Sequence, residues 1–117
     1  MIISESECDG RCHLALYGQL SGGGSELSLR EAVREYLGKG CVRFVIDLRG
    51  LESMDSAGLG ELTACHWRIR RTGGTMDLLA GSPSLVLDIL MKLGLDRVLS
   101  IVEGVPPGGA TEYGSEG

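Results

Sequence analysis

Reactive side-chain types concentrate in one short stretch, residues 47–60, which reads Asp-Leu-Arg-Gly-Leu-Glu-Ser-Met-Asp-Ser-Ala-Gly-Leu-Gly. It begins with the carboxylate of Asp47 at the end of an apolar run and places Ser56 at the start of a predicted helix. In open α/β sheets, functional groups gather where the carboxyl end of a strand leads into a helix. Two interpretations of Ser56 follow. Its hydroxyl is either reactive or serves only to cap the helix, and Asp55 or Ser56 could be that N-cap.

A serine hydrolase is the first chemistry to test, because Ser56, His66 and Asp47 are the side-chain types of a catalytic triad. His66 lies ten residues beyond Ser56 on the same predicted helix, about 15 Å along its axis. His13 is the other histidine, and the GxSxG pattern of a nucleophile elbow is absent. Because no residue is placed to act as the base, we expect no catalytic residues and a protein that is not an enzyme.

Phosphate-binding and cation-binding patterns are also incomplete. Gly38-Lys39-Gly40 lacks the rest of a phosphate-binding loop, and glycines 22–24 do not fit the dinucleotide fingerprint. Asp47 and Asp55 offer too few oxygen ligands for a hard cation. Asp47 is instead expected to hydrogen-bond the loop that follows its strand. We therefore expect no cofactor.

The four cysteines suggest neither zinc nor disulfides. Cys8, Cys12 and His13 lie close together, but the CxxC pairs of a structural zinc site are absent. Cys41 and Cys65 lie in apolar stretches and are expected to be small buried side chains. The pattern indicates no metal site and fits a reducing compartment.

Composition narrows the class further. A chain of 117 residues is sized for one domain, and 43% hydrophobic with 23% charged residues is ordinary for a globular protein. Sixteen acidic against eleven basic residues give a net charge of −5, without the basic stripe of a nucleic-acid-binding protein. Neither a signal peptide nor a long apolar run is visible. We expect a cytoplasmic protein that binds neither nucleic acid nor membrane.

The elements that position residues 47–60 can be predicted from apolar periodicity. This periodicity predicts three helices that alternate with four strands. The strands are expected at 12–20, 42–48, 75–80 and 98–102. The first helix is expected to start at a capping box of Ser28 and Glu31, and the second at Ser56. The strand at 42–48 is apolar enough to suggest cover on both faces. The predicted fold is α/β, with a mixed, mostly parallel sheet on which the helices pack.

The site stretch resembles the signature of the STAS domain, the fold of bacterial anti-sigma factor antagonists. The resemblance rests on Val45-Ile46-Asp47-Leu48-Arg49-Gly50-Leu51 and on Met54-Asp55-Ser56-Ala57-Gly58-Leu59-Gly60. Further matching stretches extend it over roughly 12–102; they are 18–20, 71–74 and 93–98. We therefore place a single STAS domain at 1–103 and interpret the Gly/Pro-rich residues 104–117 as a disordered tail.

The resemblance implies a partner-switching cycle in which Ser56 is the phosphorylation site. The unphosphorylated domain would bind an anti-sigma factor that is also a serine kinase, and so free a sigma factor. Phosphorylation of Ser56 would end that complex, and a serine phosphatase would restore it. The partner-binding surface implied around Ser56 comprises Met54, Asp55, Ser56, Ala57, Gly58 and Glu61, with a place in the core as the equal alternative for Met54. The domain would act as a monomer or weak dimer.

Alternatives remain at this stage. STAS domains often end in a further helix, which the sequence after Val102 does not predict. The domain could be a scaffold or a regulatory subunit of a stress-sensing or transporter complex. It could also be a small-molecule binding module, with its pocket between residues 21–25 and 55–60. Trp67, which lies off the apolar stripe of its helix, marks a contact surface or packs under a loop.

Overall fold

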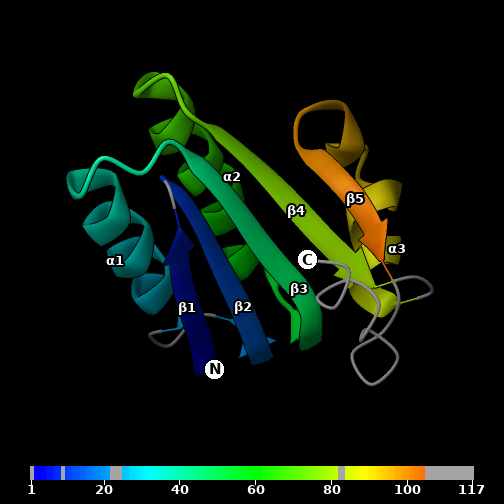
Figure 1. Cartoon of the computed structure of the whole chain (residues 1–117). Coiled ribbons are helices and arrows are strands. Elements are labelled where there is room, and N and C mark those ends of the chain that lie inside the picture. The colour runs from blue at the N-terminus through cyan, green and yellow to red at the C-terminus, as the bar shows by residue number, and fades with distance from the viewer. Residues whose placement is uncertain (1, 9, 22–24, 82–83, 105–117) are drawn as a thin grey trace.

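Residues 2–8, 10–21, 25–81 and 84–104 are described by the structure, a computed structural model of the chain (Figure 1). The described elements follow one another as β1 (Ile2–Cys8), β2 (Arg11–Leu20), α1 (Ser25–Gly38), β3 (Arg43–Met54), α2 (Ser56–Arg71), β4 (Thr75–Gly81), α3 (Leu85–Lys92), the short 3-10 helix η1 (Leu95–Arg97) and β5 (Ser100–Gly104). None of the helices described is both long and apolar enough to cross a membrane.

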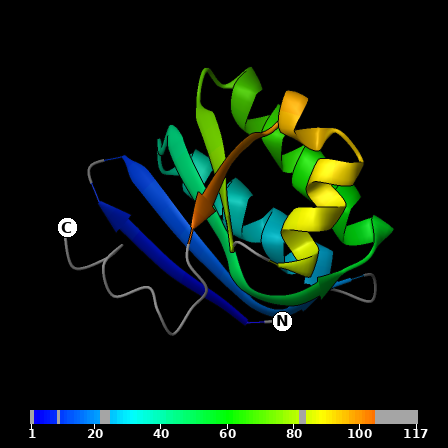
Figure 2. The same ribbon diagram turned by 90° about the vertical axis from the view of Figure 1, so that its right-hand side faces the viewer.

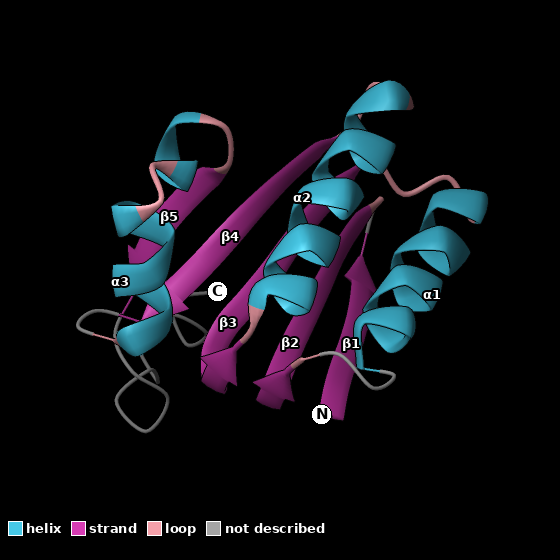
Figure 3. Cartoon of the chain, turned by 180° about the vertical axis from the view of Figure 1, so that it is seen from behind, coloured by secondary structure: helices cyan, strands magenta, loops and turns pink. Residues whose placement is uncertain are grey.

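The sheet adds its strands in the order of the sequence, β1-β2-β3-β4-β5. The first pair is an antiparallel hairpin, and the later pairs are parallel. Connections between parallel strands are nearly always right-handed. Because each new strand is added on the same side of the last, right-handed connections place all their helices on one face. Figures 2 and 3 show this arrangement, which confirms the predicted α/β fold with a mostly parallel sheet.

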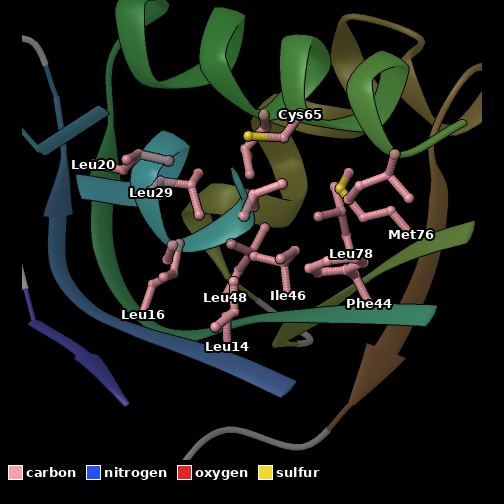
Figure 4. Packing of buried hydrophobic residues seen from close by; sticks show 14 of the residues in the cluster. Leu14, Leu16, Leu20, Leu29, Phe44, Ile46, Leu48, Cys65, Met76 and Leu78 are labelled. Carbon is pink, nitrogen blue, oxygen red and sulfur yellow. The ribbon is translucent and has the colours of Figure 1, made fainter. Parts of the chain in front are cut away.

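The core lies between that face and the helices (Figure 4). Alternate residues of the central strands point into it because strand side chains alternate between faces. Its largest fully buried side chains are Phe44, Leu14, Leu16, Leu20, Leu29, Ile46, Leu48, Leu62, Ile69, Leu78, Leu90 and Leu99. The prediction that residues 42–48 are covered by helices on both faces is wrong, since the described helices occupy one face. Val45, on the other face, is half-buried.

Several element boundaries differ from the sequence prediction. β1 was not predicted, because Ile2 and Ile3 are followed by an alternation of serine and glutamate. Residues 50–54, expected to be a connection, continue β3 to Met54. The capping box at Ser28 is wrong, since α1 already begins at Ser25 and no glycine or proline at 25–27 breaks it. The last strand starts at Ser100, two residues later than expected, because η1 precedes it.

The proposed tail largely lies outside the described residues. Gly104, assigned to it from the sequence, is the last residue of β5, and residues 105–117 are not among those described.

Candidate functional site

The start of α2 is built by Asp55, which resolves the choice between two possible N-caps. Its backbone is extended, and its Oδ1 accepts a hydrogen bond from the Gly58 N–H at 2.9 Å. Its own N–H donates to the Leu20 carbonyl at 3.1 Å, while its carbonyl accepts from the Leu59 N–H at 2.9 Å. Asp55 therefore joins the first turn of α2 to the end of β2.

Ser56 is the first residue of α2 and its side chain is exposed. Among the hydrogen bonds between described residues, none engages the Ser56 hydroxyl. Because Asp55 already caps the helix, the capping role does not account for a serine at position 56. The hydroxyl is accessible and uncommitted within the described part of the chain.

Gly58 sets how closely α2 approaches the sheet. A Cβ at this position would stand 2.3 Å from the Leu20 carbonyl oxygen and 2.7 Å from Leu20 Cγ. Real side chains do not tolerate such contacts, so only glycine lets the first turn lie against the end of β2. This close approach fixes Ser56 beside the carboxyl ends of β2 and β3, as Figure 3 shows for the elements.

The surface around Ser56 differs from the predicted partner-binding set. Asp55, Ser56 and Ala57 are exposed, but Met54, Gly58 and Glu61 are buried. Met54 points into the core, and Gly58 lies under Leu20. The placement of these three on a surface is therefore corrected. Gly60, which the predicted set leaves out, is exposed, and a Cβ there would meet no atom within 4 Å. The small residues Ala57, Gly58 and Gly60 after Ser56 were the available signal.

Glu61 is 5% exposed and forms a partly buried cluster of ion pairs with Arg30 of α1 and Arg68 of α2. Its two carboxylate oxygens accept hydrogen bonds from Arg30 Nη2 at 3.0 Å and Arg68 Nη1 at 2.7 Å. Cys65 Sγ donates to the same carboxylate at 3.3 Å. Burial opposes ionisation, but the hydrogen bonds from Arg30 and Arg68 outweigh it and hold the pKa of Glu61 below its usual value. Glu61 therefore joins two helices and presents no side chain to a partner.

Asp47 lies on the helix-free face of the sheet and does not join Ser56. Its Oδ1 accepts from the Arg49 N–H and Nε, each at 3.0 Å, and its Oδ2 from Arg49 Nη2 at 2.8 Å. His13 Nε2 lies 3.5 Å from Oδ2. Burial alone would raise the pKa of Asp47, but the hydrogen bonds from His13 and Arg49 hold this pKa well below its usual range. Asp47 thus hydrogen-bonds the chain just after it, but the predicted loop partner is wrong, because Arg49 belongs to β3, which continues to Met54.

His66, the other triad candidate, is 7% exposed on α2, and its ring makes a T-shaped contact with that of Trp67, with 4.9 Å between the ring centroids. Burial, and then the charge of Arg70, lower the pKa of His66. Trp67 itself is 53% exposed, so it packs on one side and offers the other to solvent.

The three cysteines whose side chains the structure describes are buried, but two of them also donate a hydrogen bond: Cys65 to Glu61, and Cys41 Sγ to Glu7 Oε2 at 3.2 Å. Cys12, Cys41 and Cys65 are buried, which confirms the predicted burial of Cys41 and Cys65. Burial, followed by nearby acidic and thiol groups, raises the pKa of Cys12 to about 12, and burial likewise raises that of Cys65 to about 12. Within the described ranges, no three metal-ligating side chains come together.

The sequence and the fold were compared with those of known proteins. The sequence matches the family described as "Mlab, STAS domain" over residues 3–103. The chain belongs to this STAS-domain family. No curated protein matches the sequence significantly.

Similar solved structures share the fold. The anti-sigma factor antagonist SpoIIAA in its unphosphorylated form is 16% identical, with a TM-score of 0.68 over 89% of this chain and 90% of that one. The Bacillus cell fate determinant SpoIIAA in its phosphorylated form is 16% identical, with a TM-score of 0.69 over 96% and 98%. An anti-sigma factor antagonist from Mycobacterium paratuberculosis is 20% identical, with a TM-score of 0.74 over 86% and 83%. These likenesses establish the fold.

Proposed function

We propose that the chain is a cytoplasmic anti-sigma factor antagonist switched by phosphorylation of Ser56. In the unphosphorylated state it binds an anti-sigma factor that is also a serine kinase, and a sigma factor is released. The kinase transfers a phosphoryl group to the Ser56 hydroxyl, which ends binding, and a serine phosphatase reverses the modification. The domain is thus a substrate and a ligand, and it performs no catalysis itself.

The observation that carries this proposal is the state of the Ser56 hydroxyl. It is exposed at the first position of α2, while Asp55 supplies the cap. Its exposed neighbours Ala57 and Gly60 are small, so an approaching active site meets little steric hindrance. A kinase must bring the hydroxyl close to the phosphate of its nucleotide, and this geometry permits that approach.

The fold should tolerate the modification. A phosphoserine adds about −1.5 to −2 charges, and the N-terminus of a helix favours negative charge. The hydrogen bond from Gly58 N–H to Asp55 Oδ1 does not involve Ser56, so the cap can persist. Phosphorylation should therefore leave α2 in place.

A bound partner should not tolerate it. At about 5 Å from a partner carboxylate and an effective dielectric constant near 20, each added charge repels by roughly 3 kcal/mol. Since 1.4 kcal/mol corresponds to about tenfold in affinity, phosphorylation weakens binding by ~100-fold or more. Asp55, whose carboxylate is adjacent in sequence, already makes this surface acidic.

The test compares charge variants at Ser56 in binding to the anti-sigma factor kinase, identified by pull-down from the native organism under non-phosphorylating conditions. Ser56→Asp and Ser56→Glu should fold normally and lose the partner, whereas Ser56→Ala should remain bound. Ser28→Asp, which alters an exposed serine of α1, is the matched control and should bind like the parent. Equal binding by all four variants would exclude a switch at Ser56 and favour the scaffold role.

A second measurement locates the phosphate. Incubation with ATP and that kinase, followed by mass spectrometry, should place the phosphoryl group on Ser56. Thr63 is a less suitable acceptor because its hydroxyl donates to the Leu59 carbonyl at 3.2 Å. Phosphate found on Ser28 or Thr63 instead would contradict the assignment.

A further inference from the structure

A second candidate site lies on the opposite face of the sheet from the helices, at the amino ends of the parallel strands. A cavity of about 330 Å³ opens there, lined by Arg11, Arg43, Phe44, Val45, Thr75 and Asp77. It is formed by β2, β3 and β4, whose amino ends lie at the upper edge of the sheet in Figure 1. Ser56 lies beyond the carboxyl ends of β2 and β3, so the two sites are separate.

Strand register brings the polar groups of this cavity together. Arg11 on β2 pairs with Arg43 on β3, and Arg43 pairs with Thr75 on β4. Neighbouring strands lie about 4.8 Å apart, so the three side chains form a row across the sheet. Each is exposed and is followed by a buried core residue, which places all three on the helix-free face. Val45, one pleat further along β3, provides an apolar floor.

The charges in this row are unbalanced. Like charges at directly opposite positions of adjacent strands are destabilising. Within the described part of the chain, neither Arg11 nor Arg43 forms an ion pair with a carboxylate. Asp77 is diagonal to Arg43 across the strand pair, so the wall holds two positive charges against one negative. This excess positive charge stands on a chain whose net charge is −5.

We infer that this cavity binds an anion of the phosphate-monoester class, held between the guanidinium groups of Arg11 and Arg43. Guanidinium groups match the geometry of phosphate oxygens and bind them through paired N–H donors. The Thr75 hydroxyl supplies a further donor beside them. A volume of about 330 Å³ is at the lower end of small-molecule pockets, which suits a compact phosphorylated group.

Asp77 gives the proposal a distinctive consequence. Its carboxylate lines the same cavity and repels an anion, so its removal should strengthen binding while removal of either arginine weakens it. Non-specific attraction to exposed arginines anywhere on the surface would not distinguish these positions. The effect of Asp77 thus separates a site from general electrostatics.

The test is a titration of the ¹⁵N-labelled full chain with inorganic phosphate, at constant ionic strength against chloride, followed by amide chemical shifts. Shifts should concentrate at the amino ends of β2, β3 and β4. Arg11→Gln and Arg43→Gln should each lower the affinity by about tenfold or more, and Asp77→Asn should raise it by several-fold. Arg34→Gln, at an exposed arginine of α1, is the matched control and should leave the affinity unchanged.

Vesicles of anionic phospholipid form a second arm that separates a lipid headgroup from a free phosphate as the source. Co-sedimentation that depends on Arg11 and Arg43 would support the site with a headgroup as ligand. Co-sedimentation that the arginine variants leave unchanged, or phosphate shifts that scatter over the surface, would overturn the proposal. So would the absence of binding in both arms. The arginine variants are exposed substitutions and Asp77 is half-buried, and the amide spectra of all variants report folding in the same experiment.

Discussion

Two glycines of α2, Gly58 and Gly60, have opposite requirements although they are two residues apart. The Cβ of any other residue at 58 would collide with the Leu20 carbonyl, while a Cβ at 60 would meet no atom within 4 Å. A glycine inside a helix costs about 0.5–1 kcal/mol relative to alanine when nothing else requires it. Substitutions at Gly58 and Gly60 therefore measure separately the effect of close packing and the effect of helix propensity on stability.

We predict that Gly58→Ala destabilises the fold by about 1–3 kcal/mol, because α2 must shift away from β2. Gly60→Ala, the matched control, should stabilise it by about 0.5–1 kcal/mol. Urea denaturation followed by circular dichroism measures both. Similar free energies of unfolding for the two variants would show that α2 does not depend on the contact at Leu20.

The same comparison applies to the cap. Asp55→Ala removes the acceptor of the Gly58 N–H and should cost about 1 kcal/mol, within the range of 0.5–2 known for N-caps. Ser56→Ala should change the free energy of unfolding by less than about 0.5 kcal/mol, since its hydroxyl makes no hydrogen bond to a described residue. Thermal denaturation in parallel resolves the difference. A larger loss at Ser56 than at Asp55 would mean that the serine is the true cap.

At the scale of elements, the contact of α1 with α2 depends on the cluster of Arg30, Glu61 and Arg68. Glu61 is nearly enclosed, but the side chains of Arg30 and Arg68 are 37% and 25% exposed. When the carboxylate is lost, water can solvate both arginines. The cost should therefore lie below the 3–5 kcal/mol of a fully buried pair.

Glu61→Gln is accordingly expected to destabilise the protein by about 1–2 kcal/mol. Glu31→Gln, at an exposed position of α1, serves as the control and should be within about 0.5 kcal/mol of the parent. Chemical denaturation at moderate salt provides the measurement. A neutral effect of Glu61→Gln would show that packing alone holds the two helices together.

Much of the architecture could be predicted at this scale, because helix and strand periodicities are local. The order of strands and helices after residue 12 needed only apolar spacing and glycine stops. β1 was not predicted because Ser4-Glu5-Ser6-Glu7 has no apolar face, and the register of β1 is set by its pairing with β2. Glu61 was misplaced because its enclosure depends on Arg30 of α1, 31 residues away in sequence.

The candidate site could also be predicted in part from the sequence. Ser56 at a helix start and Asp55 beside it follow from capping preferences and the STAS signature. The burial of Gly58 does not follow from the sequence, because it arises where α2 meets Leu20. For Met54 the sequence left surface and core open, and the choice depends on β3 continuing to residue 54. The phosphorylation of Ser56 remains a prediction that the experiments above address.

At the scale of the whole molecule, the folded protein should lose stability in acid through His66 and, at lower pH, through the carboxylates of Asp47 and Glu61, because the pKa of each is lowered. Burial lowers the pKa of His66 from its ordinary value of 6.5. As the pH falls below 6.5, the unfolded chain therefore binds a proton more readily than the folded chain, and the free energy of unfolding decreases. The pKa of Asp47 is lowered from 3.8, so its contribution is complete above that value and is lost as the pH falls further. Stability should fall in two ranges.

We predict a decrease in melting temperature between pH 7 and pH 5 that is attributable to His66. His66→Gln should flatten this range, and Asp47→Asn should alter only the decline below about pH 4. Thermal scans of the three proteins across both ranges provide the test. An unchanged slope between pH 7 and pH 5 in His66→Gln would refute the assignment.

The sequential strand order also affects how the chain is made. Each parallel pair joins strands that are neighbours in sequence, so every strand that leaves the ribosome finds its pairing edge already synthesised. Proteins are synthesised at about 5–20 residues per second, far slower than helix or hairpin formation. The sheet can therefore grow from the β1–β2 hairpin one strand at a time. β5 is added last, and until it docks the edge of β4 remains open to pairing with another chain.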